Sequence, residues 1–145
     1  MKVKIYTHTR VRNKEGAAAY VIEAPGLPTS ANNPTTKIGA IKETTRNEAE
    51  VTCLLGALQR LRASSDIEIH TESGYIRSEL AVLKAHKAGD YKNSKGERIQ
   101  YAYIWEKVAG ILDKQQSVEV LLDTNNEWTS WMHGETDRRI NGRGQ

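Results

Sequence analysis

The hydrophobic pattern of the chain changes its period near residue 45. Before that point, three short runs rich in alternating apolar, β-branched and aromatic residues occupy 3–7, 17–24 and 37–44. After it, apolar residues recur at helical spacing from 47 to 62, and strand-like and helix-like segments then alternate. The first pattern predicts an antiparallel meander, and the second predicts parallel strands joined by right-handed helical crossovers.

The remaining elements follow from the same two periods. We expect further strands at 66–72 and 117–123, and further helices at 73–87, 99–116 and 125–136. The order β-β-β-α-β-α-α-β-α belongs to the α/β class and predicts a mixed five-stranded sheet with helices on both faces. A loop at 25–36, which holds all three prolines, is expected to join the second and third strands.

Length and composition bound the organisation of the chain. A chain of 145 residues suits one domain with one core, which we expect at 1–135, followed by a polar, basic tail at 136–145 that frays. The net charge of +3 permits a polyanionic partner without requiring one. No apolar run approaches the roughly 20 residues of a membrane span. Cys53 is the single cysteine, which excludes an internal disulfide and a cysteine-based zinc cluster. The N-terminus lacks the apolar core of a signal peptide, so the expected location is cytoplasmic, without a membrane or disulfide partner.

Three segments, in this order and on these elements, carry a resemblance to the ribonuclease H family. They are TTRNEAEVTCLLGAL at the start of the first helix, IEIHTESGYI at the end of the fourth strand, and KAGDYKNSKGERIQYAYIWEKV leading into the third helix. The resemblance covers about residues 2–134 and implies the ribonuclease H-like fold. It also implies cleavage of the RNA strand of RNA–DNA hybrids by two Mg²⁺ ions held by four carboxylates.

The resemblance places the four carboxylate positions at His8, Glu50, Glu72 and Ser130. Two of the four carboxylates are therefore replaced, and Glu50, Glu72 and His8 are the expected catalytic residues and metal ligands. Their charge of about −2, against about −4 for four carboxylates, leaves room for one weakly held Mg²⁺ or Mn²⁺. The imidazole of His8 shifts the preference toward Mn²⁺, Zn²⁺ or Ni²⁺.

Alternatives remain open at each of these positions. Asp123 and Glu127 are possible substitutes if the backbone shifts, and Ser130 itself is most simply a small helix residue. Glu50 and Glu72 are also explained as carboxylates near helix N-termini, and His8 as a packing residue. The other histidines of the helices, His86 and His133, show no spacing typical of metal ligands.

The resemblance also implies contacts with a nucleic-acid duplex. The expected contact residues are basic or polar, with one aromatic: Arg10, Arg46, Asn47, Lys84, Lys87, Tyr91, Lys92 and Lys95. Lysines in a polar loop are, on composition alone, more often a solvated surface than a phosphate-binding site, and the resemblance favours phosphate binding.

Three functions are compatible with these patterns. The leading one is a divergent ribonuclease H homologue that binds an RNA–DNA hybrid or a related duplex, with weak or lost metal-dependent hydrolysis. The second is an active metal-dependent ribonuclease H with a rearranged site. The third is a catalytically inert protein-interaction module on the same fold. The fold alone does not decide among them, because function depends on the site.

Overall fold

The structure is a computed structural model that describes residues 2–24 and 35–142. Its strands are β1 (Lys2–Arg12), β2 (Glu15–Glu23), β3 (Thr35–Ile41), β4 (Asp66–Thr71) and β5 (Ser117–Leu122). Its helices are α1 (Arg46–Leu58), α2 (Gly74–Ala81), α3 (Leu83–Ala88), α4 (Ala102–Leu112) and α5 (Thr129–Gly142). The predicted order of elements is confirmed except between β4 and β5, where three helices replace the expected two.

The strands form one mixed sheet in the order β3-β2-β1-β4-β5. β1 pairs with β2, and β2 with β3, in antiparallel register, whereas β4 pairs in parallel with both β1 and β5. The predicted meander and parallel crossovers are therefore confirmed. In the β1–β4 pair, Tyr6 lies opposite His70, and this register fixes which side chains meet at the end of the pair.

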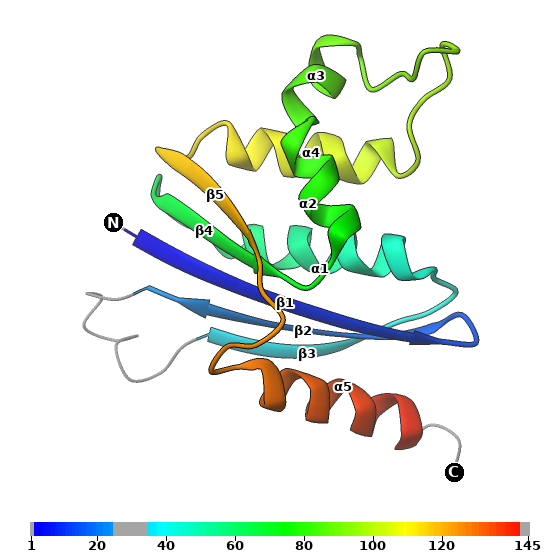
Figure 1. Ribbon diagram of the computed structural model, residues 1–145, viewed down its shortest axis with the longest axis vertical. Helices are drawn as coiled ribbons and strands as arrows, with labels where there is room; N and C mark the ends of the chain where they lie inside the picture. The colour runs from blue at the N-terminus through cyan, green and yellow to red at the C-terminus, as the bar shows by residue number, and fades with distance from the viewer. Residues whose placement is uncertain (1, 25–34, 143–145) are drawn as a thin grey trace.

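Helices cover the two faces of the sheet unequally, as Figure 1 shows. The helix α5 alone lies against one face, where it contacts β1 and β2, while α1 contacts the same two strands from the other face. The helices α2, α3 and α4 lie on the α1 side. The structure contains, within the residues that it describes, no helix long and apolar enough to cross a membrane.

Alternation along β1 distributes its side chains between two apolar clusters. Val3 and Ile5 belong to the larger cluster, which α1 and α4 complete and which encloses Trp105. Tyr6 belongs to a smaller cluster under α5, together with Met132. Successive residues of β1 therefore face opposite layers, and the residues that share the face of Tyr6 meet α5.

Two predicted segments differ from the observed ones. The helix expected at 73–87 begins as predicted after Ser73, which accepts a hydrogen bond from the backbone N–H of Ile76, but it divides at Val82, where the backbone leaves helical geometry. The tail expected to fray from 136 onward is helical to Gly142, because Thr136 and Ile140 are buried against the rest of the protein. Most of the proline-rich loop expected at 25–36 lies outside the described residues.

Candidate metal centre

The parallel register of β1 and β4 brings His8 and Glu72 together. Since Tyr6 lies opposite His70, the next side chains on the same face are those of His8 and Glu72. Their contact is short, with 2.5 Å between His8 Nδ1 and Glu72 Oε2. The predicted convergence of these two residues at the carboxyl end of the central strands is thus a feature of the structure.

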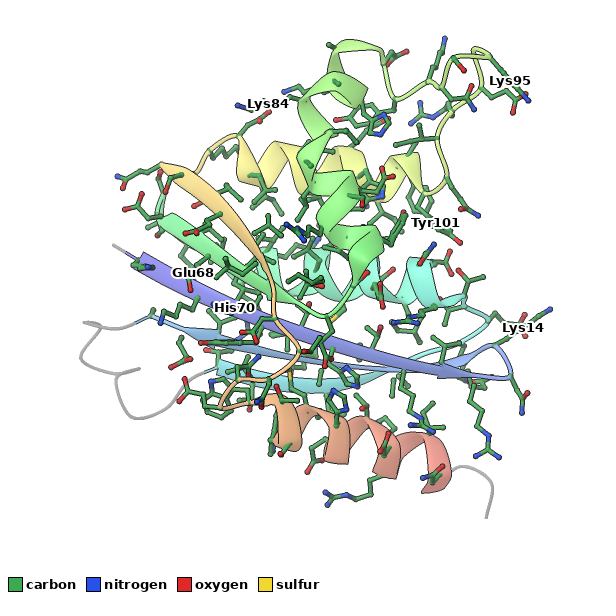
Figure 2. All side chains as sticks on the ribbon, in the orientation of Figure 1. Lys14, Glu68, His70, Lys84, Lys95 and Tyr101 are labelled. Atoms are coloured by element: carbon green, nitrogen blue, oxygen red, sulfur yellow. The ribbon has the colours of Figure 1, made fainter. Side chains whose placement is uncertain are left out.

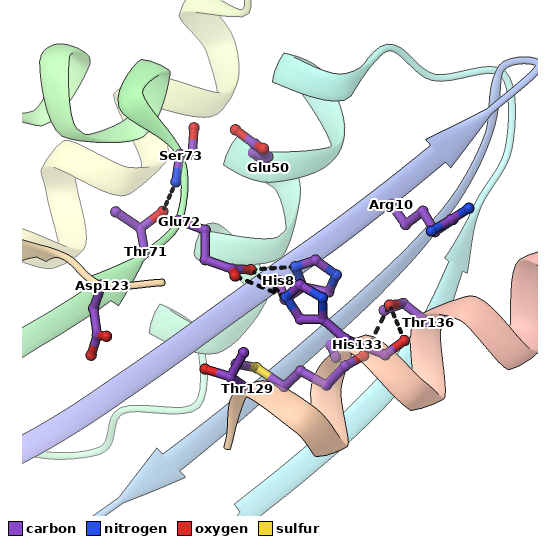
Figure 3. A network of polar contacts seen from close by, with 12 residues as sticks. His8, Arg10, Glu50, Thr71, Glu72, Ser73, Asp123, Thr129, His133 and Thr136 are labelled. Carbon is purple, nitrogen blue, oxygen red and sulfur yellow. Dashed lines mark hydrogen bonds and ion pairs between the residues drawn. The ribbon is translucent and has the colours of Figure 1, made fainter. Parts of the chain in front are cut away.

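The third member of this group is His133 of α5. Its neighbour Met132 and Thr136, one turn further on, are both buried, so this turn of the helix is held against the sheet. His133 Nε2 lies 2.8 Å from Glu72 Oε1, and its ring stacks on that of His8 with 3.8 Å between centroids and 13° between planes. Figure 3 shows both imidazoles directed at the single carboxylate of Glu72.

These three side chains present one donor atom each within a small volume. A nitrogen of His8, a nitrogen of His133 and a carboxylate oxygen of Glu72 all lie within 4.8 Å of one another. Two imidazoles and one carboxylate are ligands that transition metals accept. We refer to His8, Glu72 and His133 as the histidine–glutamate triad.

A cavity of about 280 Å³ adjoins the triad, because β1 and β4 are no longer paired beyond Tyr6 and His70. Glu50 reaches this cavity from α1, with a side chain that is only 10% exposed. Its Oε1 accepts a hydrogen bond from Arg46 Nε at 3.2 Å, whereas its Oε2 has no partner among the described residues. A buried carboxylate oxygen without a partner is costly, so this wall of the cavity is suited to a cation or a hydrogen-bond donor.

Burial controls the protonation of His8. Removal from water lowers the pKa of His8 below its ordinary value, and this effect exceeds the opposite influence of the Glu72 carboxylate. The electrostatic influence of the neighbouring His133 acts in the same direction as burial. A neutral imidazole carries a lone pair on one nitrogen, which is the form that binds metals.

The substitutes expected from the sequence do not reach the triad. Asp123 Oδ2 lies 2.7 Å from His70 Nδ1, and Figure 3 shows its carboxylate directed away from Glu72. Glu127 and Ser130 are exposed, and neither lines the cavity beside Glu50. The structure therefore corrects two expectations. His133, and not Asp123, Glu127 or Ser130, lies beside Glu72 where a substitute ligand was expected. Its ring nitrogen has the geometry of a metal ligand, although its spacing along the chain did not indicate one.

His133 was missed because the motif was counted along the chain, while the rotation of α5 is set by packing. Ser130, the position given by the count, points to solvent, and His133 lies almost one helical turn further on. The spacing of Met132, Thr136 and Ile140 at intervals of four defines the buried stripe of α5. His133 follows Met132 directly, so that stripe was the signal available in the sequence.

Some of the residues expected to contact nucleic acid have no ion pair among the described residues, and others are engaged in ion pairs within the protein. Lys84, Lys92 and Lys95 are exposed, and Asn47 is half-buried. Others are engaged in ion pairs: Arg10 with Asp137, Arg46 with Glu50, and Lys87 with Asp113. Figure 2 shows Lys84 and Lys95 on opposite sides of the part of the molecule above the sheet, so these two lysines do not form one patch.

Tyr91 differs from its expected role. It is only 6% exposed and packs within the larger apolar cluster. Burial raises the pKa of its hydroxyl above the ordinary value. Its ring is therefore part of the core, where it cannot stack on a base at the surface.

A second histidine–carboxylate cluster lies on the same face of the sheet, nearer the start of β4. His70 contacts Glu68 Oε1 through Nε2 at 2.6 Å and Asp123 Oδ2 through Nδ1 at 2.7 Å, and Lys2 Nζ lies 2.8 Å from Glu68 Oε2. The ring of His70 stacks on that of Tyr6 at 4.4 Å. We refer to Lys2, Glu68, His70 and Asp123 as the inner cluster, which the sequence analysis did not identify.

The carboxylates of the inner cluster are stabilised in their charged form. The hydrogen bond from Lys2 is the main cause that lowers the pKa of Glu68, and His70 adds to it. Burial alone would raise the pKa of Asp123, but hydrogen bonds from His70 and from the backbone N–H of Asn125 outweigh it, so that this pKa is also lowered. Each ring nitrogen of His70 therefore contacts one of the two carboxylates.

Comparison with known proteins identifies the relatives of this chain. Ribonuclease H of Legionella pneumophila (strain Paris) is 25% identical over 109 residues, which cover 74% of this chain and 73% of the relative. Ribonuclease H of Rickettsia massiliae (strain Mtu5) is 29% identical over 115 residues, covering 78% and 72%.

Solved structures share the fold at low identity. LC11-RNase H1 in complex with an RNA/DNA hybrid matches with a TM-score of 0.68 at 19% identity, over 99% of both chains. The foamy viral protease–reverse transcriptase in complex with an RNA/DNA hybrid matches with a TM-score of 0.68 at 14% identity, over 94% of this chain and 19% of that one. The family model described as RNase H matches residues 1–121, a match that ends before α5. The chain therefore belongs to the ribonuclease H family.

Proposed function

We propose that this protein binds an RNA–DNA hybrid or a related nucleic-acid duplex, and that its Mg²⁺-dependent hydrolysis of the RNA strand is weak or lost. Binding is supported by the family, whose divalent-metal chemistry acts on nucleic acid, and by structural neighbours whose titles name an RNA/DNA hybrid and double-stranded DNA. Loss of hydrolysis is supported by one observation, the histidine–glutamate triad.

The donor set does not fit a pair of Mg²⁺ ions. Mg²⁺ is a hard cation that requires near-octahedral oxygen ligands, and two such ions carry a charge of about +4. The cavity offers the carboxylates of Glu50 and Glu72, while the other two positions nearest to Glu72 are the imidazoles of His8 and His133. The oxygen ligands and the negative charge that two Mg²⁺ ions need are therefore insufficient.

Duplex binding requires cations that can reach phosphates. Arg46 begins α1 beside the cavity, and its side chain is 74% exposed even while it contacts Glu50. Asn47 follows it at the same end of the helix, where backbone N–H groups favour anions. Lys92 and Lys95 lie in an exposed loop before α4. These groups are the proposed phosphate contacts, with Arg46 the one nearest to the triad.

The test measures binding and cleavage of one end-labelled RNA–DNA hybrid. We expect binding that weakens steeply as salt increases, and Arg46→Ala to reduce the slope of log affinity against log salt by about 1. In Mg²⁺ we expect no cutting of the RNA strand. Cutting in Mg²⁺ that disappears in Glu72→Gln contradicts the loss of hydrolysis, and absence of binding at low salt contradicts the proposal as a whole and favours an interaction module.

A second candidate is hydrolysis by a rearranged site. The observation that favours it concerns Glu50, which lines the same cavity as the triad. Its Oε2 is buried and accepts no hydrogen bond from any described residue. This candidate predicts cutting of the RNA strand in Mn²⁺ but not in Mg²⁺. It also predicts that both Glu50→Gln and His133→Ala abolish that cutting, whereas His86→Ala, at a histidine on α3, leaves it unchanged.

A further inference from the structure

We infer that the histidine–glutamate triad is a binding site for one borderline transition-metal ion, of the class of Zn²⁺, Co²⁺ or Ni²⁺, and that it discriminates against Mg²⁺. The inference deepens the proposed function, since it rests on the same site. Its test contains no nucleic acid, so that failure of duplex binding and failure of metal binding are told apart.

The first support is the convergence of the donors. Ligand atoms of a tetrahedral Zn²⁺ lie about 2.0–2.2 Å from the ion, which places them roughly 3.3 Å from one another. In the triad, Glu72 lies 2.5 Å from His8 Nδ1 and 2.8 Å from His133 Nε2, and all three donor atoms lie within 4.8 Å. Entry of an ion therefore needs displacements of about 1 Å, in which the protons of the present hydrogen bonds are replaced by the metal.

The second support is the freedom of the rings to adjust. The two imidazoles are nearly parallel, so their lone pairs lie in two separate planes and must tilt toward each other to meet at one ion. Rotation of a histidine ring about its Cβ–Cγ bond has a broad energy minimum, so the tilt is inexpensive. His133 is 44% exposed on the side chain, which leaves its ring space to move.

The third support is the composition of the coordination sphere. Two imidazoles and one carboxylate supply three protein ligands, which is the pattern of zinc sites that keep a fourth position open. The fourth position faces the cavity, where Glu50 Oε2 has no partner among the described residues. A water bound to the ion and donating to Glu50 would satisfy this oxygen, which no described neighbour does.

Selectivity follows from the chemistry of the donors. Imidazole nitrogen suits Zn²⁺, Co²⁺ and Ni²⁺, and the affinity of such sites rises along the first-row series, whereas Mg²⁺ keeps its water and prefers carboxylate oxygen. A single carboxylate in the triad also gives the site less negative charge than Mg²⁺ needs. Replacing one imidazole by a carboxylate should shift this preference toward Mg²⁺.

The experiment titrates untagged, chelator-treated protein with Co²⁺, observed by its visible absorption, and with Zn²⁺ in competition with a chromophoric chelator. We expect one equivalent to bind, with a Co²⁺ spectrum typical of low coordination number, and excess Mg²⁺ not to displace it. His133→Ala should lower the Zn²⁺ affinity by at least about 100-fold, since loss of a mere neighbour of a ligand costs 10- to 100-fold. His86→Ala, which removes a partly exposed histidine paired with Glu79, is the matched control and should leave the affinity unchanged.

Two further variants keep the test decisive. His133→Asp should weaken Zn²⁺ binding and strengthen Mg²⁺ binding, which distinguishes a metal ligand from a residue that only supports the fold. Glu72→Gln should abolish Co²⁺ absorption while circular dichroism remains that of the wild type. Absence of a stoichiometric ion, binding that survives in His133→Ala, or equal competition by Mg²⁺ would overturn the inference.

Discussion

The triad and the inner cluster place histidines beside carboxylates on the same face of one sheet, yet their ratio of histidines to carboxylates is opposite. In the inner cluster, one histidine lies between two carboxylates, one on each ring nitrogen, and Lys2 neutralises the excess negative charge. In the triad, two histidines share the one carboxylate of Glu72. In the inner cluster, each carboxylate has a partner within the cluster. In the triad, two ring nitrogens and one carboxylate oxygen, all possible metal ligands, lie close to one another.

Their surroundings differ in the same sense. The inner cluster lies over paired strands, with the ring of Tyr6 stacked on His70, and its histidine side chain is 11% exposed. The triad lies where the pairing of β1 and β4 has ended, beside a cavity that contains an unpartnered oxygen of Glu50. The inner cluster thus has the composition of an ion-pair network that stabilises the fold, whereas the triad has that of the metal site inferred above.

The largest expected effect breaks the inner cluster. His70→Ala removes the shared partner of Glu68 and Asp123, which leaves Glu68 with Lys2 alone and Asp123 with the backbone N–H of Asn125. We expect the free energy of unfolding in urea to fall by about 2–4 kcal/mol, since breaking a buried ion pair leaves uncompensated charge. The same substitution at His133 should cost less than about 1 kcal/mol, because that side chain is half-exposed and the triad keeps a second histidine. Equal losses at the two positions would contradict the division of roles.

The second effect is stabilisation of the protein by Zn²⁺. Here we expect the substitution in the triad, and not the one in the inner cluster, to have the larger effect. Zn²⁺ at 100 times its dissociation constant should stabilise the wild type by about 2.7 kcal/mol, because only the folded state binds it. His133→Ala should lose this gain, while His70→Ala, although less stable, should keep it. The measurement is the urea midpoint with Zn²⁺ and after treatment with a chelator. If the stabilisation by Zn²⁺ is lost in His70→Ala and kept in His133→Ala, the ion binds at the inner cluster and not at the triad.

Much of this comparison could be anticipated from the sequence, and the part that could not depends on contacts between distant segments. Alternation in β1 and β4 was sufficient to predict the two strands, because strand period is a property of short segments. The placement of His8 beside Glu72 came from the resemblance to the ribonuclease H family. The partner of His70 was not predictable in this way, since Asp123 lies 53 residues further along the chain.

The rotation of α5 marks the same limit. Motif counting assigned the fourth position to Ser130, but the burial of Met132 and Thr136 turns His133 toward Glu72. The break between α2 and α3 at Val82 was missed for a related reason, because both sides of the break carry a helical period and a single backbone geometry decides it. Local patterns therefore predicted the elements, whereas packing decided which side chains meet.

The third effect is a dependence on pH that belongs to the inner cluster. The pKa values of Glu68 and Asp123 are lowered on folding from ordinary values of 4.5 and 3.8. A carboxyl whose pKa is lower in the folded state contributes stability above its unfolded pKa and loses it as the pH falls through the folded pKa. Glu68→Gln should therefore be less stable than the wild type near neutral pH, and the difference in urea midpoint should shrink as the pH falls below about 4. A difference that is constant with pH would mean that Lys2 and His70 do not stabilise the ionised form.

The smallest effect is a change in stability that should have opposite signs at two carboxylates of one helix. Glu50→Gln removes a charge whose Oε2 is buried without a described partner and whose Oε1 meets only an exposed arginine, so we expect stability to rise by about 0.5–1 kcal/mol. Glu48→Gln, two residues earlier, removes a charge from the first turn of α1 and weakens the hydrogen bond that Glu48 accepts from the Thr44 hydroxyl at 2.9 Å, so the same chemical change should lower stability by a similar amount. Urea unfolding of the two variants in parallel measures both signs. A loss of stability in Glu50→Gln would mean that this carboxylate supports the fold as Glu48 does, and the cavity would then lose its strongest indication of a ligand. A gain in stability means that the protein keeps, beside the triad, a charge without which it would fold more stably.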